Sequence, residues 1–556
     1  MRRWIAVVMM AALALAGCAT LPMDGDVQQS ETRMPQDPRT EVLARGPVED
    51  SSPEEIVSGF LLASSFGTDQ FNAARSFLTP GAAETWSPTE SVYLYTSDRD
   101  PETHVEADGS ITVSVDPVAR IDAYGNYIPL VDETHTLSFS LVVGADEQWR
   151  IAALDDGVMI SDQTFLQVYV PAPLHFVSAD EGALVPDLRW FPQTTAPQLI
   201  VENLLAGPSG WLQDSVTSAF PSDVSIGPDG VYVEEGVVTI DLTSEASEIS
   251  ESDGELMLAQ LQQSFAALTD ISVVEVTVEG EDSLGIDSVR TFPFPQSVST
   301  PYMLQDGALV RWDGAEMEIV NDSAEFLQLD ARYPTVPYSE SSAPIVVVSD
   351  GNELRTVPTD AAASRILYEG QNLVPPSYDR YDWVWTTPEI ADGTLIAATG
   401  TGEVRHVSAP WLESQDVERV AVSVGGDRIA VVTRVDEVDV LSVAVIIRDI
   451  TGAPSRIGAP QEIAPTLESV SDIGWLDQTS LTVLGAEPES VSDLLFIVAV
   501  EGPIEQRPYL TAAVSLTSQR SERSIMMAND EGTLFLRTGS TWRTIANNVQ
   551  DPAYSG

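Results

Sequence analysis

The sequence predicts an exported chain made of an α+β domain, an α/β domain and a C-terminal β-propeller of about six blades. Three observations predict it: a lone cysteine after a short apolar N-terminal run, mixed helical and strand periodicity between residues 51 and 290, and strand–turn repeats beyond residue 300. A chain of 556 residues exceeds what one hydrophobic core organises. The predicted segments are a signal peptide (1–17), a tether (18–50), the α+β domain (51–162), the α/β domain (163–290) and the propeller (291–556).

The N-terminus has the layout of a lipoprotein signal peptide. Arg2 and Arg3 precede an apolar run of 13 residues from Trp4 to Ala16, and Leu-Ala-Gly stands directly before Cys18, the sole cysteine. The run is shorter than the roughly 20 residues that a membrane-spanning helix needs. Because small residues before such a cysteine resemble the bacterial lipobox, we expect Cys18 to be acylated and to anchor the chain at the extracytoplasmic face of the cell membrane. The alternative is an uncleaved anchor, or an ordinary signal peptide that ends near a cysteine.

The charge balance excludes a nucleic-acid binder. The chain has 85 acidic residues against 27 basic ones, all of them arginine, for a net charge of −58. Such a field repels nucleic acid and anionic lipid, so an acyl chain, not charge, is expected to hold the protein at a membrane. With Cys18 acylated, no thiol remains for zinc binding or nucleophilic catalysis. Acidic residues, prolines and glycines without hydrophobic periodicity predict a flexible tether up to about residue 50.

The first folded domain begins with a capping box. Ser52 and Glu55 flank Pro53, and an apolar face follows, which together predict a helix start. A second helix is predicted from Asp69, and period-two alternation over 111–115, 137–143 and 149–154 predicts strands. Helices followed by a curved antiparallel sheet resemble the NTF2-like cone, a fold that often holds a pocket.

The second domain alternates strands and helices. The pattern predicts strands over 165–170, 236–242 and 274–280 and helices over 198–206 and 255–268. The segments Val-Tyr-Val, Leu-Leu-Ala-Gly-Pro and Gly-Val-Val-Thr-Ile-Asp-Leu resemble the GerMN domain over about 164–285, a family of envelope proteins without established catalytic residues. Ser209 follows a helix and lacks the glycine two positions later, so it is predicted to lie in a turn and not in a nucleophile elbow. Asp229-Gly230 is predicted as a hairpin tip, not a metal loop.

The last part of the chain repeats short strands and tight turns. From Gly307 to Gly532 the turns span 225 residues in five intervals, a mean of 45, which is the period of propeller blades and not of a β-sandwich. The turns are Asp306-Gly307, Asp350-Gly351, Asp392-Gly393, Gly425-Gly426, Asp477-Gln478 and Glu531-Gly532. Trp312, Trp385, Trp475 and Trp542 are predicted to pack between blades, with ligand stacking as the alternative.

The order of lipobox, tether, α+β domain, GerMN domain and propeller resembles the actinobacterial lipoprotein LpqB family. That resemblance implies a regulator that binds the extracytoplasmic domain of the sensor histidine kinase MtrB. Through the MtrAB two-component system it would influence cell-wall metabolism and division. The only functional residue that the family carries over is the lipidated Cys18.

No enzyme activity, catalytic residue, cofactor or metal site is predicted. The four histidines, His104, His135, His175 and His406, lie in no recognisable catalytic motif. Two alternatives stay open. One is an envelope module that binds peptidoglycan or another wall glycan through exposed aromatics such as Tyr378, Tyr381, Trp383 and Trp385. The other is a propeller hydrolase with a central metal, for which His406 is the available histidine.

Overall fold

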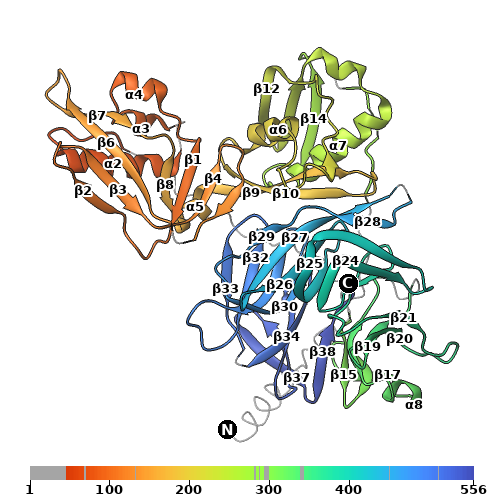
Figure 1. Cartoon of the computed structure of the whole chain (residues 1–556). Coiled ribbons are helices and arrows are strands. Elements are labelled where there is room, and N and C mark those ends of the chain that lie inside the picture. The colour runs from red at the N-terminus through yellow and green to blue at the C-terminus, as the bar shows by residue number, and fades with distance from the viewer. Residues whose placement is uncertain are drawn as a thin grey trace, which may run out of the picture. The chain divides into compact units, whose positions relative to one another are not determined.

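The computed structural model describes residues 45–556 apart from 68–70, 132, 281–283, 287, 293–299, 339–342, 450 and 511 (Figure 1). Cys18, the predicted signal peptide and most of the predicted tether therefore lie outside the described residues. Within the described ranges, no helix combines the length and the apolar character needed to cross a membrane.

The first domain combines short helices with two four-stranded sheets, ordered β5-β4-β1-β8 and β2-β3-β6-β7. Its elements are α2 Pro53–Phe66, α3 Asn72–Arg75, α4 Pro80–Thr85, β1 Ser91–Tyr95, β2 Glu102–Val105, β3 Ile111–Val115, β4 Pro117–Asp122, β5 Tyr127–Pro129, β6 His135–Val143, β7 Trp149–Leu154, β8 Val158–Ser161 and α5 Asp162–Val168. The predicted capping box is confirmed: Ser52 Oγ accepts the Glu55 N–H at 3.3 Å, and Glu55 Oε2 accepts the Ser52 N–H at 2.8 Å.

The second predicted helix is only one turn long. Asp69 lies outside the described residues, and α3 ends at Arg75. Thr79 caps α4 and Pro80 opens it, and a residue before proline is disfavoured in the helical region, so a helix cannot continue through Thr79. Phe77 and Leu78 are buried as predicted, but Phe77 lies in the turn after α3 and Leu78 forms a bridge with Ile151.

The second domain contains two three-stranded sheets, β10-β9-β11 and β12-β13-β14, of which β13 and β14 run parallel. Its elements are β9 Tyr169–Ser178, β10 Leu184–Pro192, α6 Ala196–Ala206, β11 Val216–Thr217, β12 Ile226–Glu234, β13 Val237–Leu242, the 3₁₀ helix η2 Ser244–Glu248, α7 Glu251–Phe265 and β14 Val273–Val278. Helix α7 begins earlier than predicted because Ser250 accepts the N–H of Asp253 as its cap.

Two local predictions in this part of the chain are wrong. The strand predicted over 165–170 is helical up to Val168, because Ser161 caps α5 and the apolar residues Phe165 and Val168 also fit helical spacing. Asp229-Gly230 is not a hairpin tip. It lies at an irregularity inside β12, and the turn falls at 235–236, because the buried Asp241 carboxylate accepts the Asp229 N–H and fixes the bulge there.

The C-terminal domain is a propeller. Its elements are β15 Tyr302–Gln305, β16 Ala308–Trp312, β17 Met317–Asn321, α8 Ala324–Leu327, β18 Ala331–Thr335, β19 Val346–Ser349, β20 Glu353–Thr356, β21 Ile366–Glu369, β22 Ser377–Tyr378, β23 Trp383–Thr386, β24 Ile390–Thr399, β25 Val404–Val422, β26 Arg428–Val435, β27 Val438–Arg448, β28 Pro454–Ile457, β29 Gln461–Ile463, β30 Ser469–Trp475, β31 Ser480–Ala486, β32 Leu494–Ala499, β33 Ile504–Arg507, β34 Ala513–Gln519, β35 Ser521–Asn529, β36 Leu534–Thr538, β37 Thr541–Ala546 and β38 Val549–Ala553.

The described strands of this domain form six blades. Four sheets have four strands each, and an eight-stranded sheet divides into two blades at the long strand β25, whose first part pairs with β24 and whose second part pairs with β26. Strand β38 pairs with β15 and so supplies the innermost strand of the first blade, which closes the ring (Figure 1). The innermost strands β38, β18, β22, β25, β30 and β34 surround the axis.

The repeated turns that predicted the blades are not equivalent positions. Gly307, Gly351 and Gly532 lie after the second strand of their blades, counted from the axis, whereas Gly426 and Gln478 lie after the first. Asp392-Gly393 lies within β24 at an irregularity. The mean spacing of 45 residues therefore reflects the blade length, while the individual turns differ from blade to blade.

Candidate functional site

The four histidines lie on four different strands and do not converge. His104 is exposed on β2, and the His135 ring on β6 stacks on Tyr93 with 3.5 Å between ring centroids. His175 is buried on β9, and burial lowers its pKa to about 4. His406 is exposed on β25, with its ring edge against Tyr368, so it does not point into the propeller axis as a central metal ligand would.

The aromatic residues expected to form an exposed glycan-binding face are packed inside the propeller. Tyr378, Trp383 and Trp385 are 0%, 6% and 0% exposed. The Trp385 indole donates a hydrogen bond to Asp379 at 3.0 Å, and the Arg448 guanidinium covers the Tyr381 ring at 4.2 Å. Tyr378, Trp383 and Trp385 offer no exposed ring and the half-buried Tyr381 is covered by Arg448, so these residues do not form the exposed aromatic face that was expected. The packing role predicted for Trp385 is confirmed, and the same holds for the buried Trp475.

A cavity of about 350 Å³ lies on the propeller axis, lined by the innermost strands and the segment after β38. Its charged lining residues are Arg332, Arg419, Arg520, Asp472, Asp530 and Asp551. These six formal charges cancel, whereas the whole chain carries −58. Small-molecule sites are typically concave pockets of roughly 300–1,000 Å³ with a few convergent polar groups, so size and lining both fit such a site.

The cavity residues lie where the innermost strands leave regular register. The pairing slips between Arg332 and Thr335 on β18, at Arg419 on β25 and at Asp472 on β30. Similar slips occur in β34 and where β38 pairs with β15. A bulge re-aims side chains relative to a regular strand, and bulges are frequent beside functional sites. Tyr333, with φ of 52°, is a bulky residue in the left-handed region at this rim.

Ion pairs join neighbouring blades around the cavity. Arg332 donates two hydrogen bonds to Asp551, at 2.6 and 3.0 Å, which connects the second blade to the first. Arg419 reaches Asp472 at 3.4 Å across the fourth and fifth blades, and Asp472 also accepts the Leu516 N–H of the sixth. The Arg332 side chain is 47% exposed, so its polar atoms remain accessible beside the pair.

A second polar region lies at the junction between the second domain and the propeller. On β10, Arg189 donates two hydrogen bonds to Asp187, at 3.0 and 2.8 Å, and both side chains are nearly inaccessible. The turn after β32 brings Glu501 to this pair. Its carboxylate accepts the Leu188 N–H at 3.0 Å and the Trp211 indole N–H at 2.9 Å, and its backbone carbonyl accepts the indole N–H of Trp190 at 2.9 Å.

The junction places two carboxylates beside one guanidinium. Burial raises the pKa of Glu501 to about 8, the nearby Asp187 carboxylate adds to the shift, and Arg189 opposes it. Ser209 also belongs here: its backbone N–H donates to Asp187 at 2.8 Å, and the residue lies in a turn, as predicted. The junction therefore holds a proton more readily than an exposed carboxylate would.

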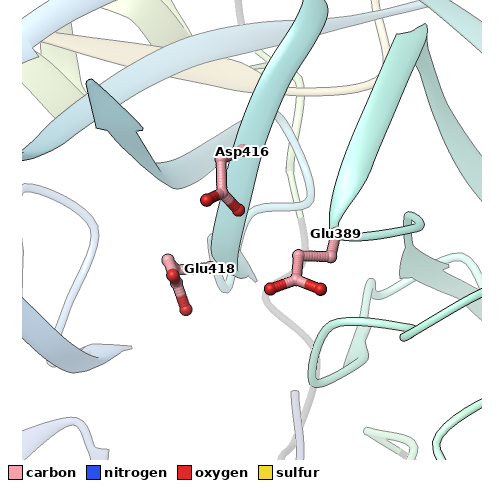
Figure 2. Close-up of side chains that lie close together, drawn as sticks. All are labelled: Glu389, Asp416 and Glu418. Carbon is pink, nitrogen blue, oxygen red and sulfur yellow. The ribbon is translucent and has the colours of Figure 1, made fainter. Parts of the chain in front are cut away.

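Three carboxylates of Glu389, Asp416 and Glu418 form an acidic cluster whose nearest oxygens lie within 4.8 Å of one another. Figure 2 shows Asp416 and Glu418 on the long strand β25 and Glu389 just before β24, with the carboxylates turned toward one another. Arg434 approaches Glu418 at 2.9 Å and relieves the repulsion, and Asn372 donates to Glu389 at 2.9 Å. Calcium needs about 6–8 oxygen ligands, so this partly neutralised cluster is an incomplete cation site.

Sequence reasoning missed both the cavity and the junction. The cavity draws its lining from strands spread over more than 200 residues, and no local pattern joins them. The junction had a weak signal, since Asp187 and Arg189 interrupt an otherwise apolar strand that is buried on both faces. Glu501 next to Gly502 looks like an ordinary exposed turn, and only the fold brings it to β10.

Comparison with known families accounts for nearly all the described chain. A family model for the lipoprotein LpqB N-terminal domain matches residues 46–166, one for sporulation and spore germination proteins matches 168–283, and one for the lipoprotein LpqB β-propeller domain matches 307–555. These matches confirm the predicted order of an α+β domain, a GerMN domain and a propeller.

Curated relatives match over almost the full length. Lipoprotein LpqB of Streptomyces avermitilis is 26% identical, with 98% of this chain and 97% of the relative covered. The protein of the same name from Streptomyces coelicolor is 28% identical, over 98% and 96%. Among solved structures, the first GerMN domain of the sporulation protein GerM from Bacillus subtilis is 19% identical, over 22% of this chain and 92% of that one, with a TM-score of 0.18.

Proposed function

The chain belongs to the LpqB lipoprotein family, and from this premise we propose that it is a lipid-anchored, extracytoplasmic binding protein that modulates a two-component sensor kinase. The observation that carries the proposal is the full-length match to proteins named lipoprotein LpqB, together with the sole cysteine at position 18 behind an apolar run. In this proposal Cys18 carries the acyl anchor, and the partner is the extracytoplasmic domain of a sensor histidine kinase of the MtrB type. The consequence is control of cell-wall metabolism and division.

The described side chains support binding more than catalysis. The histidines lie on separate strands, Ser209 uses its backbone N–H to hold Asp187, and the acidic cluster near β25 is partly neutralised by Arg434. Anchoring raises the local concentration of the protein at the membrane, so a weak interface with a kinase suffices. An interface that prefers one of two kinase states shifts the signalling equilibrium by its difference in affinity.

The test is a membrane pull-down from an actinobacterial host. Tagged wild type and Cys18→Ala are expressed side by side, membranes are separated, and captured proteins are identified by mass spectrometry. We expect wild type in the membrane fraction with a sensor kinase, and the variant displaced and depleted of that kinase. A matched substitution at an exposed position, Ser58→Ala, serves as the control and should behave as wild type. Recovery of wild type without any kinase under cross-linking would contradict the kinase role.

A further inference from the structure

We propose that the axial cavity of the propeller is a binding site for an uncharged saccharide. The proposal is independent of the kinase interaction and concerns a different place in the molecule. It also differs from a glycan face on the aromatic residues near 378–385, because those rings are buried.

The charges of the lining favour an uncharged ligand. Three arginines and three aspartates line the cavity, and the ion pairs Arg332–Asp551 and Arg419–Asp472 leave little net field inside it. An anionic or cationic ligand would have to compete with these pairs for its counter-charge. The acidic surface of the chain, at −58 overall, further repels anions that approach the cavity.

The hydrogen-bonding groups suit neighbouring hydroxyls, each of which both donates and accepts. Guanidinium groups only donate, ionised carboxylates only accept, and hydroxyl and amide side chains do both. The lining offers all three kinds, among them Arg332, Asp551, Thr517, Gln519 and Ser555. Gln519 donates to Ser555 at 3.1 Å, which holds the two groups in one orientation before a ligand arrives.

Aromatic and strained residues complete the site. Tyr338 and Tyr554 line the cavity wall, and at 4% and 8% exposed they are packed into it and shape it. Tyr333 lies in the left-handed region, stacks under the Arg332 guanidinium at 4.7 Å, and donates its N–H to Asp551. Strained backbone of this kind persists where the surrounding structure holds it, and it is common at ligand sites.

The test is a calorimetric titration of the purified full chain in detergent with three disaccharides of similar size. The probes are uncharged N,N′-diacetylchitobiose, the cationic glucosamine dimer and the anionic galacturonic acid dimer. We expect saturable binding of the uncharged probe with a Kd below about 1 mM, and binding of the charged probes about tenfold weaker or more. Equal or tighter binding of a charged probe, or no saturable binding of the uncharged one, overturns the proposal. So does preferential binding of a neutral peptide such as acetyl-trialanine amide.

Two matched variants locate the binding. Val514 is 50% exposed and lines the cavity, so Val514→Trp should obstruct it without disturbing a packed core. Val491 is fully exposed outside the cavity lining, and Val491→Trp is the control. We expect Val514→Trp to weaken chitobiose binding about tenfold or more, and Val491→Trp to leave it unchanged. Equal affinity of both variants would place the sugar elsewhere and overturn the proposal.

Discussion

The propeller cavity and the junction at Glu501 both contain arginine–carboxylate pairs, but water reaches them differently. At the cavity the Arg332 side chain is 47% exposed, whereas at the junction Arg189 and Asp187 are 3% and 0% exposed. An accessible pair contributes little to stability because water screens it, and its polar atoms remain available to a ligand. An inaccessible pair depends on its partners, since a lone buried charge is strongly unfavourable. The same residue types therefore favour recognition in one place and rigidity in the other.

The largest expected effect comes from removing the shared cation of the junction. Arg189→Leu leaves Asp187 and Glu501 buried without a positive partner, which should destabilise the protein by about 3–5 kcal/mol. The measurement is the midpoint of thermal unfolding at neutral pH, with Arg99→Leu as control, because the Arg99 side chain is 72% exposed in its pair with Asp116. A similar midpoint for both variants would contradict the prediction, because the buried junction pair would then contribute no more than an exposed pair.

The second prediction concerns pH. Because the pKa of Glu501 is raised from 4.5 to about 8 in the folded protein, its stabilising contribution is complete below about pH 4.5 and is lost as pH rises through about 8. We expect the midpoint temperature of thermal unfolding to decrease as the pH is raised from about 6 to about 9, which corresponds to a loss of unfolding free energy on the order of 1–3 kcal/mol. Glu501→Gln should reduce this decrease. His175 affects stability in a different pH range. Its pKa is lowered from 6.5 to about 4, so its contribution is lost as pH falls below about 6.5. An unchanged pH profile in Glu501→Gln would assign the effect to another group.

A smaller effect is expected at the cavity rim. Arg332→Ala removes the two hydrogen bonds to Asp551, but that carboxylate keeps the Tyr333 N–H as a donor. The Arg332 side chain is 47% exposed, although Asp551 is 8% exposed, and the backbone donor remains, so the loss should be about 1 kcal/mol. Chemical denaturation followed by tryptophan fluorescence gives the value. A loss as large as that of Arg189→Leu would show that the rim pair is as structural as the junction.

The smallest effect is expected on the outer surface of the third blade. Arg405 and Glu403 form a pair in which both side chains are nearly half exposed. Arg405→Ala should change stability by about 0.5 kcal/mol or less, measured in the same denaturation experiment. A larger change would indicate that exposure is a poor guide to the energetics of ion pairs in this protein.

Local sequence patterns predicted the elements and their order, but they did not predict which distant segments come together in the folded protein. The capping box at Ser52 and the strands β3 and β7 were predicted correctly because their causes are local. The segment at Phe165 was assigned wrongly because its apolar spacing fits two periodicities. The junction and the cavity could not be predicted, because Glu501 meets Leu188 across 313 residues and the cavity lining comes from the whole ring.

The pairing that closes the propeller also sets the order in which it can fold. Tyr302 of β15 pairs with Ala553 of β38, about 250 residues later along the chain. The entropy of closing such a long loop grows only slowly with its length, so the finished ring loses little stability from this arrangement. Folding rate, however, falls as contacts become more distant in sequence. The first blade to be synthesised is therefore the last that can be completed, and until β38 arrives the edge of β15 remains open to mispairing with another strand.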